Sequence, residues 1–202
     1  MKYFITILLT VLMLNAVEVP KFQKNHAFAL GSEAAKELKK TLKGALGATI
    51  KKEGLVKGVQ FCANSAANLT AKVQKGLPKG VLIKRISDKV RNPANAMDEL
   101  DKTALGYFET VKKQDGEYPK HYMSKLRSKY DREMNIFRYY EPLLVGDACI
   151  KCHGTNLDPY VKNEIKKHYP NDKAIGYKKG DLRGLIVVQV LPQAIYNRAN
   201  QK

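Results

Sequence analysis

The motif Cys149-Ile150-Lys151-Cys152-His153 restricts this chain more than any other feature. Two thiols separated by two residues and followed at once by a histidine form the attachment pattern of a c-type haem. In that pattern the thiols become thioethers on the haem vinyl groups, and the imidazole lies under the iron as proximal ligand. We therefore expect one covalently attached haem c, with Cys149 and Cys152 as attachment residues and His153 as an axial ligand.

Two other chemistries use closely spaced cysteines. A structural zinc site normally has four protein ligands, but the chain has three cysteines in all and no second Cys-x-x-Cys pair. A thioredoxin-type dithiol opens a helix in a βαβ unit, whereas this motif follows the strand-like run from Ile136 to Val145. Haem attachment fits the surrounding sequence better than either alternative.

The N-terminus indicates export. An apolar run from Tyr3 to Ala16 follows Lys2; it has the length of a signal-peptide core and is shorter than the roughly 20 residues that a membrane span needs. We predict a signal peptide over residues 1–29, with cleavage after Ala29 at the small-x-small sequence Ala27-Phe28-Ala29. Cleavage near Ala16 is the alternative. The expected location is the bacterial periplasm, with no stable membrane span after cleavage.

Charge points to the kind of partner. The chain has 36 Lys and Arg against 19 Asp and Glu, a formal net charge of +17. A balance of this kind favours association with acidic molecules and speeds their encounter, although a lysine-rich solvated surface gives the same composition. In an exported haem protein we expect an acidic redox partner. The lysine runs lack the interleaved aromatic residues of a nucleic-acid groove, so we expect no nucleic-acid binding.

Residues 30–78 are predicted to form helices. A first helix is expected to start at Ser32 and to run to Leu46. In the next helix Cys62 lies on a stripe of apolar residues at helical spacing, formed with Leu55, Val59, Ala66 and Leu69. Cys62 is either a small core residue or an axial thiolate. No methionine follows His153 to act as sixth ligand, which leaves His121 and His168 as the other candidates.

Residues 79–202 are predicted to form an α+β domain, one structural unit with the preceding helices. Strands are expected at Val81 to Ile86, Ile136 to Tyr140 and Gly184 to Val190, and helices at Met97 to Val111 and Tyr160 to His168. The segment from Tyr118 to Glu133 is ambiguous. This order favours an antiparallel sheet covered on one face. The haem would lie between that sheet and the Cys62 helix.

Five segments in this order resemble a family of periplasmic c-type haem domains with a PAS-like fold, which includes heterodimeric purple cytochromes. They are Phe61-Cys62, Arg91 to Asn95, Arg138 to Leu143, Cys149 to Gly154, and Ala174 to Gly184. The resemblance implies attachment by Cys149 and Cys152 and axial ligation by His153 and Cys62. It also implies a heterodimer with a related haem subunit, and a homodimer is the alternative assembly. The apolar stripe of the helix from Ser32 to Leu46 is the expected contact in a dimer, although the same stripe could instead cover the domain. Met97 departs from the family pattern, which often has proline there.

The implied ligands have consequences for function. A thiolate favours ferric iron, so a low reduction potential is expected. Two axial ligands leave no open position, which argues against an enzyme; catalysis would need a distal group such as His121 or Tyr122 beside an open iron. Electron transfer is the expected role. The alternative is a redox or gas sensor that binds NO or CO once Cys62 is released and signals through a partner protein.

Two arginines are candidates for the haem propionates. Arg91 and Arg138 lie in segments that carry the resemblance, and a guanidinium suits a carboxylate because it can donate two parallel hydrogen bonds. Either could equally be an ordinary surface arginine.

Overall fold

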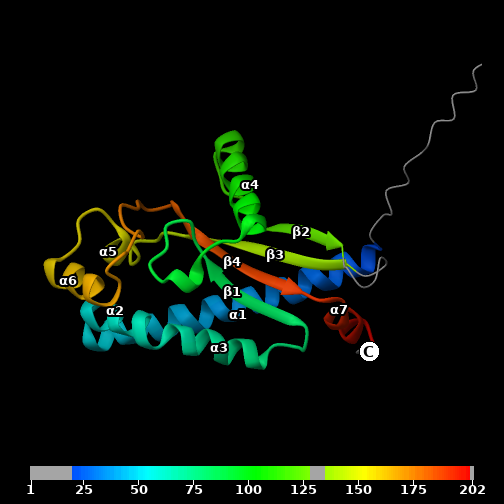
Figure 1. Ribbon diagram of the computed structural model, residues 1–202, viewed down its shortest axis with the longest axis horizontal. Helices are drawn as coiled ribbons and strands as arrows, with labels where there is room; N and C mark the ends of the chain where they lie inside the picture. The colour runs from blue at the N-terminus through cyan, green and yellow to red at the C-terminus, as the bar shows by residue number, and fades with distance from the viewer. Residues whose placement is uncertain (1–19, 128–134, 201–202) are drawn as a thin grey trace, which may run out of the picture.

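The computed structural model describes residues 20–127 and 135–200 (Figure 1). The predicted signal core from Tyr3 to Ala16 lies outside these residues, as does the end of the ambiguous segment near Glu133. Among the residues described, no helix has the length and apolarity to cross a membrane.

A four-stranded antiparallel sheet forms the centre of the molecule. Its strands are β1 (Val81–Ile86), β2 (Tyr122–Arg127), β3 (Asn135–Leu144) and β4 (Leu182–Val190), in the order β1-β4-β3-β2. The three expected strands are present, and part of the ambiguous segment forms the edge strand β2. β4 is buried along nearly its whole length because it lies inside the sheet with helices on both faces. The α+β class is therefore confirmed, while the PAS-like refinement stays a prediction.

Helices cover both faces of the sheet, whereas the sequence predicted cover on one face. The α1 (Lys21–Glu53) and α3 (Ala66–Gly76) helices pack on one face, and α4 (Glu99–Asp115) packs on the other (Figure 1). The α1 face buries Leu30, Leu38 and Tyr139 among others. On the opposite face Ala104 and Phe108 of α4 lie against Tyr140 and neighbouring apolar residues. The prediction missed this second layer because the sequence does not tell to which face a helix returns.

The remaining helices gather mainly at one end of the sheet. There α2 (Leu55–Asn64) contacts both α5 (Ile150–His153) and α6 (Pro159–His168) (Figure 1). The short η1 (Pro93–Asn95) follows β1, and α7 (Pro192–Ala199) follows β4. The helix predicted from Leu55 to Leu69 is interrupted at Ser65, so that α2 and α3 are separate helices.

The first helix begins earlier than expected, at Lys21 and not at Ser32. Its buried stripe continues upstream of Ser32: Ala27 is fully buried, and Gln23 Oε1 accepts a 3.0 Å hydrogen bond from Asn135 Nδ2. Cleavage after Ala29 would remove both contacts. Cleavage near Ala16, the alternative, would leave α1 whole.

Candidate functional site

The Cys-x-x-Cys-His motif occupies a single helical turn at the end of β3. The turn closes through hydrogen bonds to the Cys149 carbonyl, which accepts from the backbone N–H of Cys152 at 3.1 Å and of His153 at 2.9 Å. Apolar contacts hold the motif on two sides. Cys152 packs against the α2 and α6 residues Val59, Val161 and Ile165. Cys149 packs against a second apolar cluster, which is made by Val145, Ala174 and Tyr177.

The His153 imidazole is oriented by the backbone. Its Nδ1 lies 2.8 Å from the Ala174 carbonyl oxygen, which can only accept, so Nδ1 carries the proton and donates. Nε2 is then the nitrogen with a free lone pair, and it has no hydrogen bond within the described residues. A metal-binding histidine commonly donates its second ring nitrogen to a carbonyl in this way.

The electrostatic surroundings keep this imidazole neutral. Burial is the main cause that lowers the pKa of His153 to about 3, and the charges of Arg91 and Arg183 lower it further. Neutral imidazole is the form that binds a metal. The residue is therefore in a metal-binding state at neutral pH.

Arg91 anchors the motif to the segment that follows α6. Its Nη2 donates to the carbonyl oxygens of Cys152 at 2.7 Å and Ala174 at 3.2 Å. The same nitrogen lies 2.9 Å from Asp172 Oδ2, in an ion pair whose side chains are each 9% exposed. The Nε atom of Arg91 is buried and has no hydrogen bond with any described residue. The structure thus brings this predicted residue to the motif, mainly as a structural anchor.

Cys62 is brought to the same place from α2. It is half-buried, and it is near enough to Cys152 that its charge raises the pKa of that thiol, after the larger effect of burial. Burial also raises the pKa of Cys62 itself, against the opposing charges of Arg85 and Arg91. The three cysteines of the chain therefore lie in one region.

Arg85 also lies in this region, although no sequence motif singles it out. Its Nε is buried without a hydrogen-bond partner among the residues described, and Cys62 is the ionisable group whose charge affects it most. A buried donor without a partner is unfavourable, so Arg85 suits an acidic ligand group. The alternation of β1 carried the signal, because Val81, Ile83 and Arg85 share one face of the strand.

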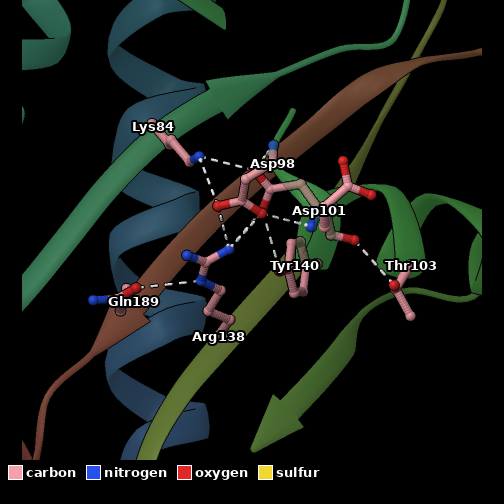
Figure 2. A network of polar contacts seen from close by, with 8 residues as sticks. Lys84, Asp98, Asp101, Thr103, Arg138, Tyr140 and Gln189 are labelled. Carbon is pink, nitrogen blue, oxygen red and sulfur yellow. Dashed lines mark hydrogen bonds and ion pairs between the residues drawn. The ribbon is translucent and has the colours of Figure 1, made fainter. Parts of the chain in front are cut away.

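Arg138 belongs to a different site. Figure 2 shows its guanidinium between Asp98, the N-cap residue of α4, and Asp101 in the first turn of that helix. Its Nη1 lies 2.8 Å from Asp98 Oδ2 and 3.1 Å from Asp101 Oδ1. Its Nε donates to Gln189. The structure therefore does not bring Arg138 to His153, because its donors serve to attach α4 to the sheet.

The other two candidate ligands have partners of their own. His121 is exposed and its ring lies 4.9 Å from that of Phe28 and 5.8 Å from that of Tyr139. His168 Nε2 lies 3.0 Å from Glu164 Oε1. Neither contact involves the motif.

Comparison with known proteins establishes the family. The family model described as Tll0287-like matches residues 14–190. The chain belongs to the Tll0287-like family. The crystal structure of the cyanobacterial heme-protein Tll0287 matches with a TM-score of 0.58 and 21% sequence identity, over 80% of this chain and 92% of that one. No curated protein matches.

The match confirms the resemblance to a haem-protein family and the mixed fold. At this identity the structural likeness shows the fold alone, so the ligand set of this Tll0287-like chain stays a prediction.

Proposed function

We propose that this chain is an exported mono-haem c-type cytochrome that transfers electrons. The observation that carries the proposal is the orientation of His153, whose Nδ1 is held by the Ala174 carbonyl at 2.8 Å directly after two thiols in the same turn. The matched protein Tll0287 is described as a heme protein, which supports the same cofactor here. When bound, haem c would supply one-electron redox chemistry.

The residues of the site fit such a group. Cys149 and Cys152 would hold it as thioethers, and the neutral imidazole of His153 would be the proximal ligand. Cys62 would supply the second axial ligand from α2. The buried, unpaired Nε atoms of Arg85 and Arg91 would serve its acidic groups, a role that Arg138 cannot fill while its donors serve Asp98 and Asp101.

Electron transfer is favoured over the alternatives by the same ligands. With His153 and Cys62 both on the iron, no position would be open to a substrate, so we propose no enzymatic role. The formal net charge of +17 favours an acidic redox partner, and a homodimer or a heterodimer with a related haem subunit is compatible with this role. We propose a periplasmic location with cleavage near Ala16, because α1 then keeps its buried contacts.

The test compares the wild type with Cys62→Ser and with a matched control on the same helix turn, Ala63→Ser. We expect covalent haem in the intact mass of all three, which also reports the mature N-terminus. Low-temperature EPR and absorption spectra should show a low-spin thiolate signature that only Cys62→Ser loses. Absence of covalent haem in the wild type would contradict the cytochrome proposal, and an unchanged Cys62→Ser spectrum would remove Cys62 as a ligand.

The same samples separate electron transfer from sensing. Reduced wild-type protein is exposed to CO and to NO, with Cys62→Ser as the reference for an open site. Electron transfer predicts no spectral change in the wild type. Gas binding by the reduced wild type would favour the sensor, in which release of Cys62 signals through a partner protein.

A further inference from the structure

The Nδ1 side of His153 faces two guanidinium groups. Arg91 Nη2 lies 3.2 Å from the Ala174 carbonyl oxygen, the same atom that accepts from Nδ1. Arg183 Nε lies 3.4 Å from Nδ1 itself. Because Nδ1 donates its only proton to the closer carbonyl, Arg183 stands beside the ring as a cation and not as a hydrogen-bond donor to it.

The two cations differ in how their charge is balanced. Arg91 forms a 2.9 Å ion pair with Asp172. Arg183 has no carboxylate within ion-pair distance among the described residues, and its Nη1 donates to neutral oxygens, those of Ser87 Oγ at 2.6 Å and of the Lys89 carbonyl at 3.2 Å. The uncompensated positive charge near His153 is therefore that of Arg183.

Several contacts fix Arg183 in this place. The Ser87 hydroxyl is buried and reaches both ends of the residue: it accepts from Nη1 and lies 2.9 Å from the Arg183 carbonyl. The guanidinium carbon lies 5.5 Å from the centre of the Tyr177 ring, and that ring meets His153 edge-on at 6.3 Å. One face of the arginine is thus packed against the ring that also supports the imidazole.

A glycine makes the approach possible. A Cβ atom at Gly184 would lie 2.2 Å from the Ile86 carbonyl oxygen. Only glycine lets the start of β4 come this close to the end of β1, where Ser87 follows. Gly184 therefore allows the neighbouring Arg183 to reach its hydrogen-bond partner Ser87.

We infer that Arg183, through its charge beside Nδ1 of His153, raises the reduction potential of the site above the value set by its ligands alone. The inference rests on the proposed function. A fixed positive charge disfavours the oxidised state of the haem, because oxidation adds a positive charge in a region of reduced dielectric constant. The low potential expected of a thiolate ligand would be partly offset.

The test measures midpoint potentials of the haem-loaded protein by spectroelectrochemistry. Arg183→Gln removes the charge and keeps a donor for Ser87, and Arg183→Lys keeps the charge. The control Arg198→Gln removes the charge of a partly exposed arginine that pairs with Glu33. In Arg183→Gln we expect the ferric to ferrous ratio at the wild-type midpoint to rise about tenfold, which is about 59 mV for one electron. Arg183→Lys should retain most of the wild-type potential, and Arg198→Gln all of it.

Each other result overturns the inference. Equal potentials in the wild type and Arg183→Gln would show that the charge does not act on the site. If the midpoint potential falls equally in Arg183→Gln and Arg183→Lys, with altered absorption spectra, the role of Arg183 is structural alone. If Arg183→Gln does not fold, Ser87→Ala takes its place: it releases Nη1, so the potential should fall in the same direction by less, and no fall overturns the inference. A wild type without covalent haem would overturn the proposed function itself.

Discussion

At the scale of single residues, Asp101 is the most consequential side chain outside the motif. Its carboxylate is fully buried, and three donors from two strands reach it, namely Lys84 Nζ at 2.8 Å, Arg138 Nη1 at 3.1 Å and Tyr140 Oη at 3.2 Å (Figure 2). It also forms the capping box at the start of α4 with Asp98. One carboxylate therefore fastens a helix to the sheet.

We predict that Asp101→Asn lowers the free energy of unfolding by about 2–3 kcal/mol, because it leaves two cations facing a neutral amide in a buried site. Urea denaturation of the protein measures the effect. Glu99→Gln is the control, since Glu99 lies in the same helical turn and its ion pair with Lys102 is exposed. That change should stay within about 0.5 kcal/mol. An equal decrease in the free energy of unfolding of the two variants would show that the burial of Asp101 does not determine its contribution to stability.

The residues of the site differ in how far the sequence predicts them. The motif was recognised because its thiols and imidazole are neighbours in the chain, and the structure places them in one turn. The partners of Arg138 could not be predicted, because the carboxylates of Asp98 and Asp101 lie 40 and 37 positions away in the sequence. The anchor of His153, the carbonyl of Ala174, could not be predicted, since every residue carries a carbonyl and only the fold selects one.

At the scale of elements, α1 lies unusually close to β3. A Cβ atom at Gly31 would lie 2.5 Å from Cβ and 2.6 Å from Cγ of Tyr139, and both residues are buried. Gly44 lies further along the same helix, where a Cβ would meet nothing within 4 Å. Alanine substitutions at these two positions therefore distinguish the cost of close packing from the gain in helix propensity.

We predict opposite effects of alanine at these two positions. Gly31→Ala should destabilise the protein by about 1–3 kcal/mol, because overpacking against the Cβ atom and the ring of the buried Tyr139 outweighs the better helix propensity. Gly44→Ala should stabilise it by up to about 1 kcal/mol, the propensity gain alone. Thermal and urea unfolding measure both. Two changes of the same sign would contradict the close packing of α1 on β3.

The elements also show where sequence patterns are sufficient. The strands β1, β3 and β4 and the helices α4 and α6 were predicted because hydrophobic periodicity and turn residues are local features of the sequence. Two boundaries failed for physical reasons. The break at Ser65 does not interrupt the apolar stripe on which the prediction depended, and the start of α1 lies within residues that were assigned to the signal peptide.

At the scale of the whole molecule, basic residues gather near the end of the sheet that carries the motif. Lys51 and Lys52 close α1, while Lys166 and Lys167 lie in the last turn of α6. Both helices flank α2 at this end (Figure 1). With a formal net charge of +17, the field at this end should draw anionic electron acceptors towards the proposed haem.

We predict that the rate of oxidation of the reduced protein by ferricyanide falls by roughly tenfold between 0.01 M and 0.3 M salt, since the screening length shrinks from about 30 Å to less than 10 Å. The cationic oxidant tris(phenanthroline)cobalt(III) should show the opposite trend. Stopped-flow absorption measures both rates. The slope of the rate against salt concentration, compared between the two oxidants, tests the sign of the electrostatic field. Equal slopes would show that the net charge does not act at the electron-transfer surface.

A pair of matched variants tests whether the field is local. Lys51→Gln with Lys52→Gln removes two charges from the last turn of α1, and Lys21→Gln with Lys24→Gln removes two from its first turn. The net charge changes equally, but α1 runs along the sheet and its first turn lies at the end away from the motif (Figure 1). We expect the Lys51 and Lys52 pair to flatten the salt dependence with ferricyanide several-fold more than the Lys21 and Lys24 pair, because charges beyond a screening length contribute little. Equal flattening would mean that acidic partners respond to the charge of the whole molecule and that the surface around the motif has no special part in docking.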